Sequence, residues 1–166
     1  MSRGSAPGAV VVEADGGSRG NPGDAAYGAL LRSAGSGDVL GEAAERIGIA
    51  TNNVAEYHGL IAGLRLAGAL APGAPIEVRM DSRLVIEQMA GRWKIKHPSM
   101  VPLSVAARAL AGNVTGWTWV PRRQNKDADR LVNEALDGER DQPPPSLRQG
   151  LRDGDAADDE AADQLF

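Results

Sequence analysis

Four acidic residues of this 166-residue chain lie where predicted elements begin or end, and together they could form a metal site. They are Asp15, Glu56, Asp81 and Asp129. Carboxylates that converge without cationic partners repel one another and lose solvation, and a divalent cation relieves both costs. Ligands that are all oxygen favour Mg²⁺ or Mn²⁺ over zinc. Two such ions about 4 Å apart can activate a water and stabilise a leaving oxygen in phosphodiester hydrolysis.

Two of the four also have an ordinary structural explanation at the end of a predicted strand. Asp15 could form an Asx turn over Gly16 and Gly17. Asp81 could cap a helix that begins at Ser82. Neither explanation needs a metal ion.

The other two lie in the first turns of predicted helices, where acidic residues are common. Glu56 follows Asn53 by three residues, which is the spacing of a capping box. Asp129 could complement the macrodipole of a helix capped by Asn125. The metal-site hypothesis therefore depends on whether the four carboxylates meet in space.

The glycine-rich stretch VEADGGSRGNPG, residues 12–23, could be a phosphate loop, a metal site or a hairpin turn. A phosphate loop needs a Gly-Lys-Ser/Thr end, and a dinucleotide-binding fingerprint needs a helix directly after the glycines. The stretch contains no Lys, and residues 25–31 have the loose alternation of a strand. The pattern therefore predicts a hairpin with Asp15 at its mouth.

The hydrophobic periodicity predicts an α/β fold, with a five-stranded mixed sheet flanked by helices. Strands are expected at 9–14, 25–33, 38–48, 76–80 and 114–120, and helices at 53–70, 82–89, 98–110 and 125–136. Short polar links between the first three strands predict an antiparallel meander. The alternation of strands and helices afterwards predicts parallel pairing of the first, fourth and fifth strands. Trp117 and Trp119 share one face of the last strand and are expected in the core.

This topology would bring the four carboxylates together. Functional crevices in open sheets lie outside the carboxyl ends of parallel strands, so Asp15 and Asp81 would emerge side by side. Glu56 shares a helix face with Gly59, a small residue that would let the helix approach the sheet. The helix after the fifth strand would add Asp129.

Composition limits the function classes. The chain has no Cys, which excludes a disulfide framework and a thiolate zinc site, and it has only two His. The start, MSRGSAPG, lacks the apolar segment of a signal peptide, and no run approaches the ~18 apolar residues of a membrane span. We therefore expect a cytoplasmic protein without membrane contact.

Charge divides the chain unevenly. Nine acidic residues against three Arg give residues 137–166 a net charge of −6, whereas residues 1–136 carry +2. We expect a flexible N-terminus at 1–8, one folded domain at 9–137, and an acidic, proline-containing disordered tail or linker at 138–166. The basic residues of the domain are compatible with a nucleic-acid partner or with an ordinary solvated surface.

Four stretches of the chain resemble the ribonuclease HI family in order and spacing. They are DGGSRGNPG at 15, TNNVAEYHGL at 51, MDSRLVIEQM at 80 and VPRRQNKDADRLVNEAL at 120. The resemblance covers roughly residues 9–136 and implies a ribonuclease H-like catalytic domain. It implies that the catalytic, metal-binding residues are Asp15, Glu56, Asp81 and Asp129.

The resemblance also implies a reaction and its partners. It implies an endonuclease that cleaves the RNA strand of RNA–DNA hybrids and leaves 3′-hydroxyl and 5′-phosphate ends. We expect two Mg²⁺ ions per site, for which Mn²⁺ could substitute, and a monomeric protein.

Substrate-binding residues are expected on two surfaces. Short amides and a backbone N–H could contact a shallow minor groove, where the 2′-hydroxyl distinguishes RNA from DNA. These residues are Gly16, Asn21, Asn52 and Asn53. A mixed aromatic and basic segment could hold the DNA backbone, or could be a packed Trp with solvated lysines. Its residues are Arg92, Trp93, Lys94 and Lys96.

Two features depart from the family pattern. Many members carry a His on the loop before the last helix, where this chain has Arg122 and Arg123. An arginine cannot act as a base near neutral pH but can hold a phosphate, so proton shuttling by this loop is in doubt. We assign Arg123 to catalysis and Arg122 to substrate binding, although either could replace the His. The compact segment before Arg92 indicates a short form without the long basic handle.

Other interpretations remain open. Another two-metal nuclease of the same fold, such as a resolvase or exonuclease, would share the carboxylates, although Asn52, Asn53 and the Gly-Asn-Pro-Gly turn favour a hybrid substrate. A non-catalytic hybrid-binding module would not need the intact acidic set. The chain could also belong to a larger fused enzyme, with the tail as a linker or as a docking segment for a partner.

Overall fold

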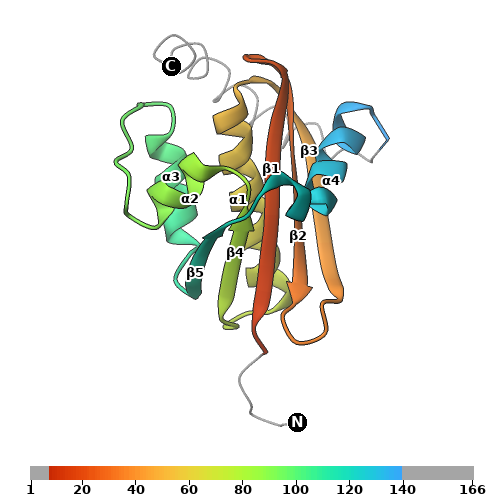
Figure 1. Ribbon diagram of the computed structural model, residues 1–166, viewed down its shortest axis with the longest axis vertical. Helices are drawn as coiled ribbons and strands as arrows, with labels where there is room; N and C mark the ends of the chain where they lie inside the picture. Colours follow the sequence, from red (N-terminus) through yellow and green to blue (C-terminus); the bar gives the residue numbers. More distant parts are fainter. Residues whose placement is uncertain (1–7, 140–166) are drawn as a thin grey trace.

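The computed structural model describes residues 8–139, which form a single sheet with helices on both faces (Figure 1). The strands are β1 (Val10–Gly20), β2 (Gly23–Ser33), β3 (Val39–Ala50), β4 (Ile76–Met80) and β5 (Val114–Trp119). The helices are α1 (Asn52–Leu70), α2 (Arg83–Met89), α3 (Val101–Ala109), the short 3-10 helix η1 (Arg122–Gln124) and α4 (Lys126–Leu136). The expected disordered tail lies almost wholly outside the described residues, as does nearly all of the expected flexible N-terminus. No helix within the described range is long and apolar enough to cross a membrane.

The sheet is mixed, as the sequence predicts. Its strand order is β3-β2-β1-β4-β5. The pairs β1–β2 and β2–β3 are antiparallel, and the pairs β1–β4 and β4–β5 are parallel. The fold class and the pairing directions expected from the periodicity are therefore confirmed.

Alternate residues of β2 face two different layers. Ala29 and Leu31 belong to the main core, which includes α1, α2 and α3. Ala26 and Leu30 pack in small separate clusters against α4. This period of two places α1 and α4 on opposite faces of the sheet.

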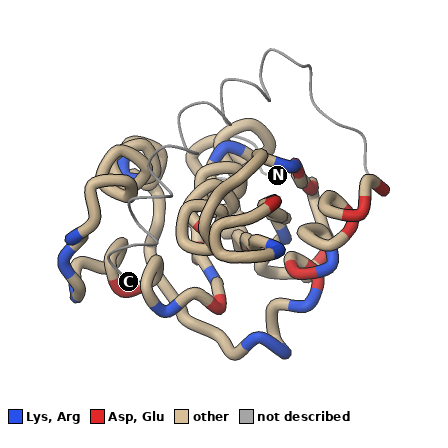
Figure 2. The backbone as a smooth tube through the Cα atoms, turned by 90° about the horizontal axis from the view of Figure 1, so that it is seen from above, with Lys and Arg blue, Asp and Glu red and all other residues tan. Residues whose placement is uncertain are grey.

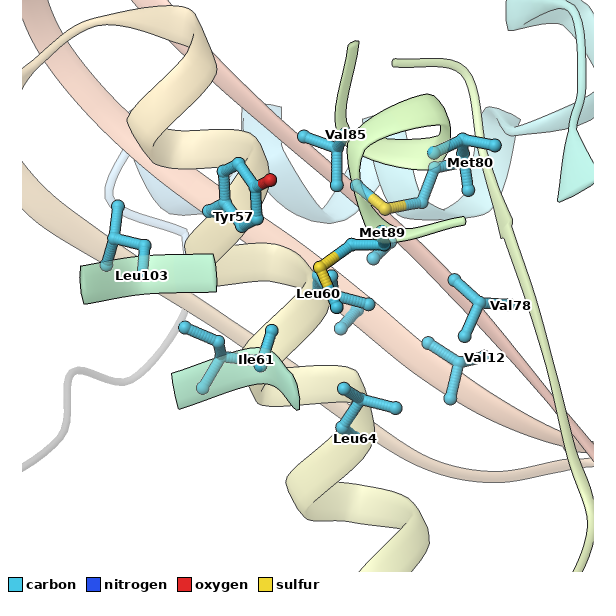
Figure 3. Close-up of a cluster of buried hydrophobic side chains, with 14 of the residues drawn as sticks. Val12, Tyr57, Leu60, Ile61, Leu64, Val78, Met80, Val85, Met89 and Leu103 are labelled. Carbon is cyan, nitrogen blue, oxygen red and sulfur yellow. The ribbon is translucent and has the colours of Figure 1, made fainter. Parts of the chain in front are cut away.

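The main core lies between α1 and the sheet, where Leu60 and Leu64 lie near Val12 and Val78 (Figure 3). Leu60 and Leu64 are fully or almost fully buried. Burying one such side chain contributes about 1.5–3 kcal/mol. The same helix that carries Glu56 therefore also anchors the core, which restricts its position.

The first strand is longer than predicted. The β1–β4 pairing ends at Ala14 and Met80, but the β1–β2 pairing continues to Gly20 and Gly23. Asp15 therefore lies within β1 rather than at its end, and the predicted position at the mouth of a hairpin turn is wrong. The extension depends on hydrogen bonding to β2, and the apolar pattern of β1 alone gives no information about that pairing.

The helix caps also differ from the local interpretations of the carboxylates. Thr51 caps α1, and its hydroxyl accepts the backbone N–H three residues later at 3.3 Å. Ser82 caps α2 in the same way at 3.2 Å. Asn53 and Asp81 are therefore not caps, and Glu56 belongs to no capping box with Asn53. The capping explanations are wrong for both acids.

Candidate functional site

Three of the four predicted carboxylates gather at one end of the β1–β4 pair. One oxygen from each of Asp15, Glu56 and Asp81 lies within 4.8 Å of the others. Asp15 and Glu56 are buried, and Asp81 is half-buried. A cavity of about 510 Å³ opens beside them. Hard oxygen ligands at these separations could hold a divalent metal ion.

The ends of two parallel strands place two of these acids. Ala14 and Met80 form the last β1–β4 pair, and Asp15 and Asp81 are the next residues along the chain. Both carboxylates therefore leave the sheet at the same edge, as predicted from the topology.

Close backbone contact brings the third acid to the same place. The Gly16 N–H donates to Glu56 Oε1 at 2.6 Å. A Cβ on Gly16 would lie 2.1 Å from the carbonyl carbon of Ala55, and one on Gly59 would lie 2.5 Å from the Asp15 carbonyl oxygen. Only residues without a side chain allow α1 to approach β1 this closely.

Burial raises the pKa of the two inner carboxylates. Burial raises the pKa of Asp15 to about 7, although a side-chain hydrogen bond with Glu56 opposes the rise, and the Asp81 charge adds to it. Burial raises the pKa of Glu56 well above its ordinary value, and the Asp15 charge adds to the rise. These directions describe an acidic pair without a cation, which is the situation that a bound metal would relieve.

The fourth carboxylate stands apart from the trio. Asp129 lines the same cavity but is not a member of the three-residue cluster. An Arg122 guanidinium nitrogen lies 3.6 Å from Asp129 Oδ1. Asp129 therefore has a cationic neighbour. Arg122 lines the cavity, whereas Arg123 is exposed and does not line it.

The predicted amides connect the β1–β2 hairpin to α1. Asn52 Oδ1 accepts the Ser18 N–H at 2.8 Å, and Asn21 Oδ1 accepts the Asn52 N–H at 3.0 Å. The carbonyl ends of these two side chains are therefore used within the protein, which leaves their NH₂ ends as the groups that could donate to a ligand. Asn53 is half-buried in the first turn of α1.

The basic and aromatic segment forms a second depression, lined by residues that do not line the carboxylate cavity. Its volume is about 500 Å³, and its lining residues are Leu84, Gln88, Arg92, Trp93, Lys94 and Lys96. Figure 2 shows basic positions in blue along the connection between α2 and α3, at the left of the view. Trp93 is 47% exposed, so the packed-Trp interpretation is wrong. No helix is present between Met89 and Val101, in agreement with the predicted absence of a basic handle.

Trp119 is a site residue that the sequence prediction placed in the core. It is 39% exposed and lines the carboxylate cavity, whereas Trp117 packs against the core. Its Nε1–H donates to the Asp81 carbonyl at 3.1 Å, and the Arg83 guanidinium lies 4.4 Å from its ring centroid. Its position as the last residue of the strand, next to the arginine loop, was the available signal.

A family profile described as reverse transcriptase-like matches residues 13–135. The chain is 56% identical over 130 residues to the bifunctional protein Rv2228c of Mycobacterium tuberculosis, covering 77% of this chain and 35% of that protein. It therefore spans about a third of the length of that relative. The solved N-terminal RNase H domain of the same protein superposes with a TM-score of 0.74, over 78% of this chain and 94% of that one.

Two further relatives extend the likeness over nearly a whole solved domain. The ribonuclease HI of Halobacterium salinarum is 46% identical over 132 residues, covering 78% of this chain and 65% of that protein. Its crystal structure has a TM-score of 0.73, over 79% of this chain and 99% of that one. The LC11 RNase H1, solved in complex with an RNA/DNA hybrid, is 35% identical with a TM-score of 0.73, over 78% of this chain and 98% of that one.

Proposed function

The chain belongs to the ribonuclease HI family, and from this premise we propose that it hydrolyses the RNA strand of RNA–DNA hybrids. The observation that carries the proposal is the convergence of Asp15, Glu56 and Asp81 within 4.8 Å at the end of two parallel strands. The hybrid-bound structure of the LC11 enzyme, which has the same fold, supports this class of substrate. We propose an endonucleolytic reaction that leaves 3′-hydroxyl and 5′-phosphate ends.

The residues present fit a site for hard divalent cations. The donors are all carboxylate oxygens, and burial without a cation raises the pKa of both Asp15 and Glu56. We propose that Asp15, Glu56 and Asp81 hold Mg²⁺, with Mn²⁺ as a substitute and with Asp129 at the rim. When bound, two such ions would supply an activated water and stabilise the charge on the leaving oxygen.

The protein groups around the trio orient the acids and the substrate. The Gly16 N–H fixes Glu56 by its 2.6 Å hydrogen bond. The Arg122 guanidinium beside Asp129 can hold a phosphate oxygen but cannot remove a proton near neutral pH. The NH₂ ends of Asn21 and Asn52 can donate to 2′-hydroxyls of the RNA strand. Proton transfer is therefore not assigned to the arginine loop.

The second depression suits the other strand of the hybrid. Lys94, Lys96 and the exposed Trp93 could contact the DNA backbone and sugars. Arg92 is paired with Glu87, so its charge is partly neutralised before any ligand binds. The monomeric state and cytoplasmic location remain predictions.

A cleavage assay on labelled substrates tests the proposal. We expect Mg²⁺ or Mn²⁺ to support cleavage of the RNA strand of a hybrid, EDTA to prevent it, and duplex DNA and duplex RNA to remain intact. Asp15→Asn should abolish cleavage while hybrid binding survives, because it removes a central carboxylate without removing the binding surfaces. Asp38→Asn, an exposed acid in the β2–β3 connection, is the matched control and should keep full activity. Full activity of Asp15→Asn, or equal cleavage of duplex DNA, would contradict the proposal.

A further inference from the structure

We propose that Asn125 is a positioning residue that holds the Asp15 segment of β1 and the Asp129 turn of α4 in one arrangement. The inference rests on the proposed function, since it concerns the carboxylates assigned to that reaction. Asn125 acts through the backbone: its side chain binds the carbonyl beside Asp15, and its own carbonyl accepts the backbone N–H of Asp129.

The Asn125 side chain joins two distant parts of the chain. It is fully buried, and its Nδ2 donates to the Ala14 carbonyl oxygen at 2.9 Å, across 111 residues of sequence. Ala14 is the residue before Asp15. Although Asn125 precedes α4, its side chain makes no capping hydrogen bond to that helix. The side-chain amide therefore connects the start of α4 to the sheet. The predicted cap would instead have bonded to the first turn of α4 itself.

The backbone of Asn125 forms two further hydrogen bonds within the same region. Its N–H donates to the Arg122 carbonyl at 2.9 Å, and its own carbonyl accepts the Asp129 N–H at 3.1 Å. One residue thus contacts the segment of Asp15, the arginine turn and the residue that carries the fourth carboxylate.

Residues 119 and 120, which precede Asn125, hold the end of β4 through similar hydrogen bonds to backbone carbonyls. The Val120 N–H donates to the Met80 carbonyl at 2.9 Å, and the Trp119 indole N–H donates to the Asp81 carbonyl at 3.1 Å. The segment 119–125 therefore crosses the end of the β1–β4 pairing and donates to a backbone carbonyl beside each of the two aspartates. Asn125 is the part of this segment that reaches β1.

The packing of α4 explains why such a connection matters. Its buried residues form two small clusters separate from the main core, centred on Ala26 with Val132 and on Leu30 with Leu131. Clusters of this size leave a helix freer to shift than a helix in the main core. A shift of about 1 Å at a reacting group can lower a rate by about 100-fold. A single buried amide hydrogen bond at the start of α4 would limit such shifts.

The test is the variant Asn125→Ala in the full chain. We expect kcat on the hybrid to fall by about 10- to 100-fold with KM changed by less than about threefold, because the reacting groups move while the binding surfaces stay. We also expect weaker Mn²⁺ binding by the nucleic-acid-free protein, measured by electron paramagnetic resonance of unbound Mn²⁺. The second readout does not depend on turnover.

A stability-matched control separates positioning from general weakening. Leu103→Ala truncates a buried residue of α3 in the main core, and it should lower the melting temperature while kcat and Mn²⁺ affinity stay at wild-type values. If Asn125→Ala does not fold, Asn125→Leu keeps a similar side-chain volume and removes the same donor without adding a charge.

Two results are distinguishable. Wild-type kcat and Mn²⁺ affinity in a folded Asn125 variant would overturn the positioning role, as would equal losses in Leu103→Ala. Absence of hybrid cleavage by the wild-type protein would instead overturn the proposed function, and the Mn²⁺ affinities would still decide the role of Asn125.

Discussion

At the scale of single residues, the candidate site contains two buried acids with raised pKa values. Asp15 binds a proton with a pKa of about 7, mainly because it is buried, and the pKa of Glu56 is also raised. An acid whose pKa is higher in the folded than in the unfolded state takes up a proton on folding at a pH between the two values. The metal-free folded state therefore binds more protons than the unfolded state between about pH 4 and pH 7.

The stability of the metal-free protein should consequently fall as pH rises through this window. With EDTA present, we expect the melting temperature of the wild-type protein to fall from about pH 4 to pH 7 more steeply than that of Asp15→Asn, which cannot ionise at this position. The stabilisation by added Mg²⁺ should grow over the same range, because binding requires deprotonated carboxylates. If the melting temperatures of the two proteins changed with pH in parallel, Asp15 would not titrate in this range.

The two loop arginines should contribute unequally. Arg122 lines the cavity beside Asp129, whereas Arg123 is exposed outside it. We expect Arg122→Ala to lower kcat by up to about 100-fold and Arg123→Ala to lower it less, since each can supply only charge and hydrogen bonds to a phosphate. Steady-state kinetics on the hybrid measures both. Complete loss of activity in Arg123→Ala would show that the exposed arginine has a role that its position does not explain.

At the scale of elements, the site depends on how closely α1 lies on β1. A Cβ on Gly59 would lie 2.5 Å from the Asp15 carbonyl oxygen, so the helix would have to move away. We expect Gly59→Ala to lower the free energy of unfolding by about 1–3 kcal/mol and to reduce kcat, because Glu56 and Asp15 separate. Urea unfolding and steady-state kinetics check the two effects.

The same helix offers a matched control. A Cβ on Gly68 would contact nothing within 4 Å. Gly68→Ala should therefore raise the free energy of unfolding by about 0.5–1 kcal/mol through its higher helix propensity and leave kcat unchanged. If Gly59→Ala behaved like Gly68→Ala, close packing of α1 would not be what sets the carboxylate geometry.

At the scale of the whole molecule, the carboxylate cavity and the basic depression would bind opposite strands of one substrate. Lys94 and Lys96 line the second depression but not the carboxylate cavity. We expect replacement of both by Gln to raise KM with little change in kcat. The slope of log affinity against log salt should become shallower by about 2, because each lysine that neutralises a phosphate contributes about 1 to it. Arg46→Gln, an exposed charge on β3, is the control and should leave the slope unchanged.

Local patterns in the sequence were sufficient to predict the elements and to identify the four acids. Apolar periodicity depends on neighbours a few residues away, so it predicted all five strands and the four α-helices, with the far end of β1 as the main error in the boundaries. The parallel pairing of β1 with β4 followed from the connection through α1, and it placed Asp15 and Asp81 at one edge.

The arrangement of the acids and the residues that surround them follow from contacts that appear only in the folded chain. The length of β1 beyond Ala14 depends on pairing with β2, and the exposure of Trp119 depends on where the sheet ends above Asp81. The separation of Asp129 from the trio depends on how α4 packs on the opposite face from α1. These features arise from contacts between residues far apart in the chain, and no local pattern records them.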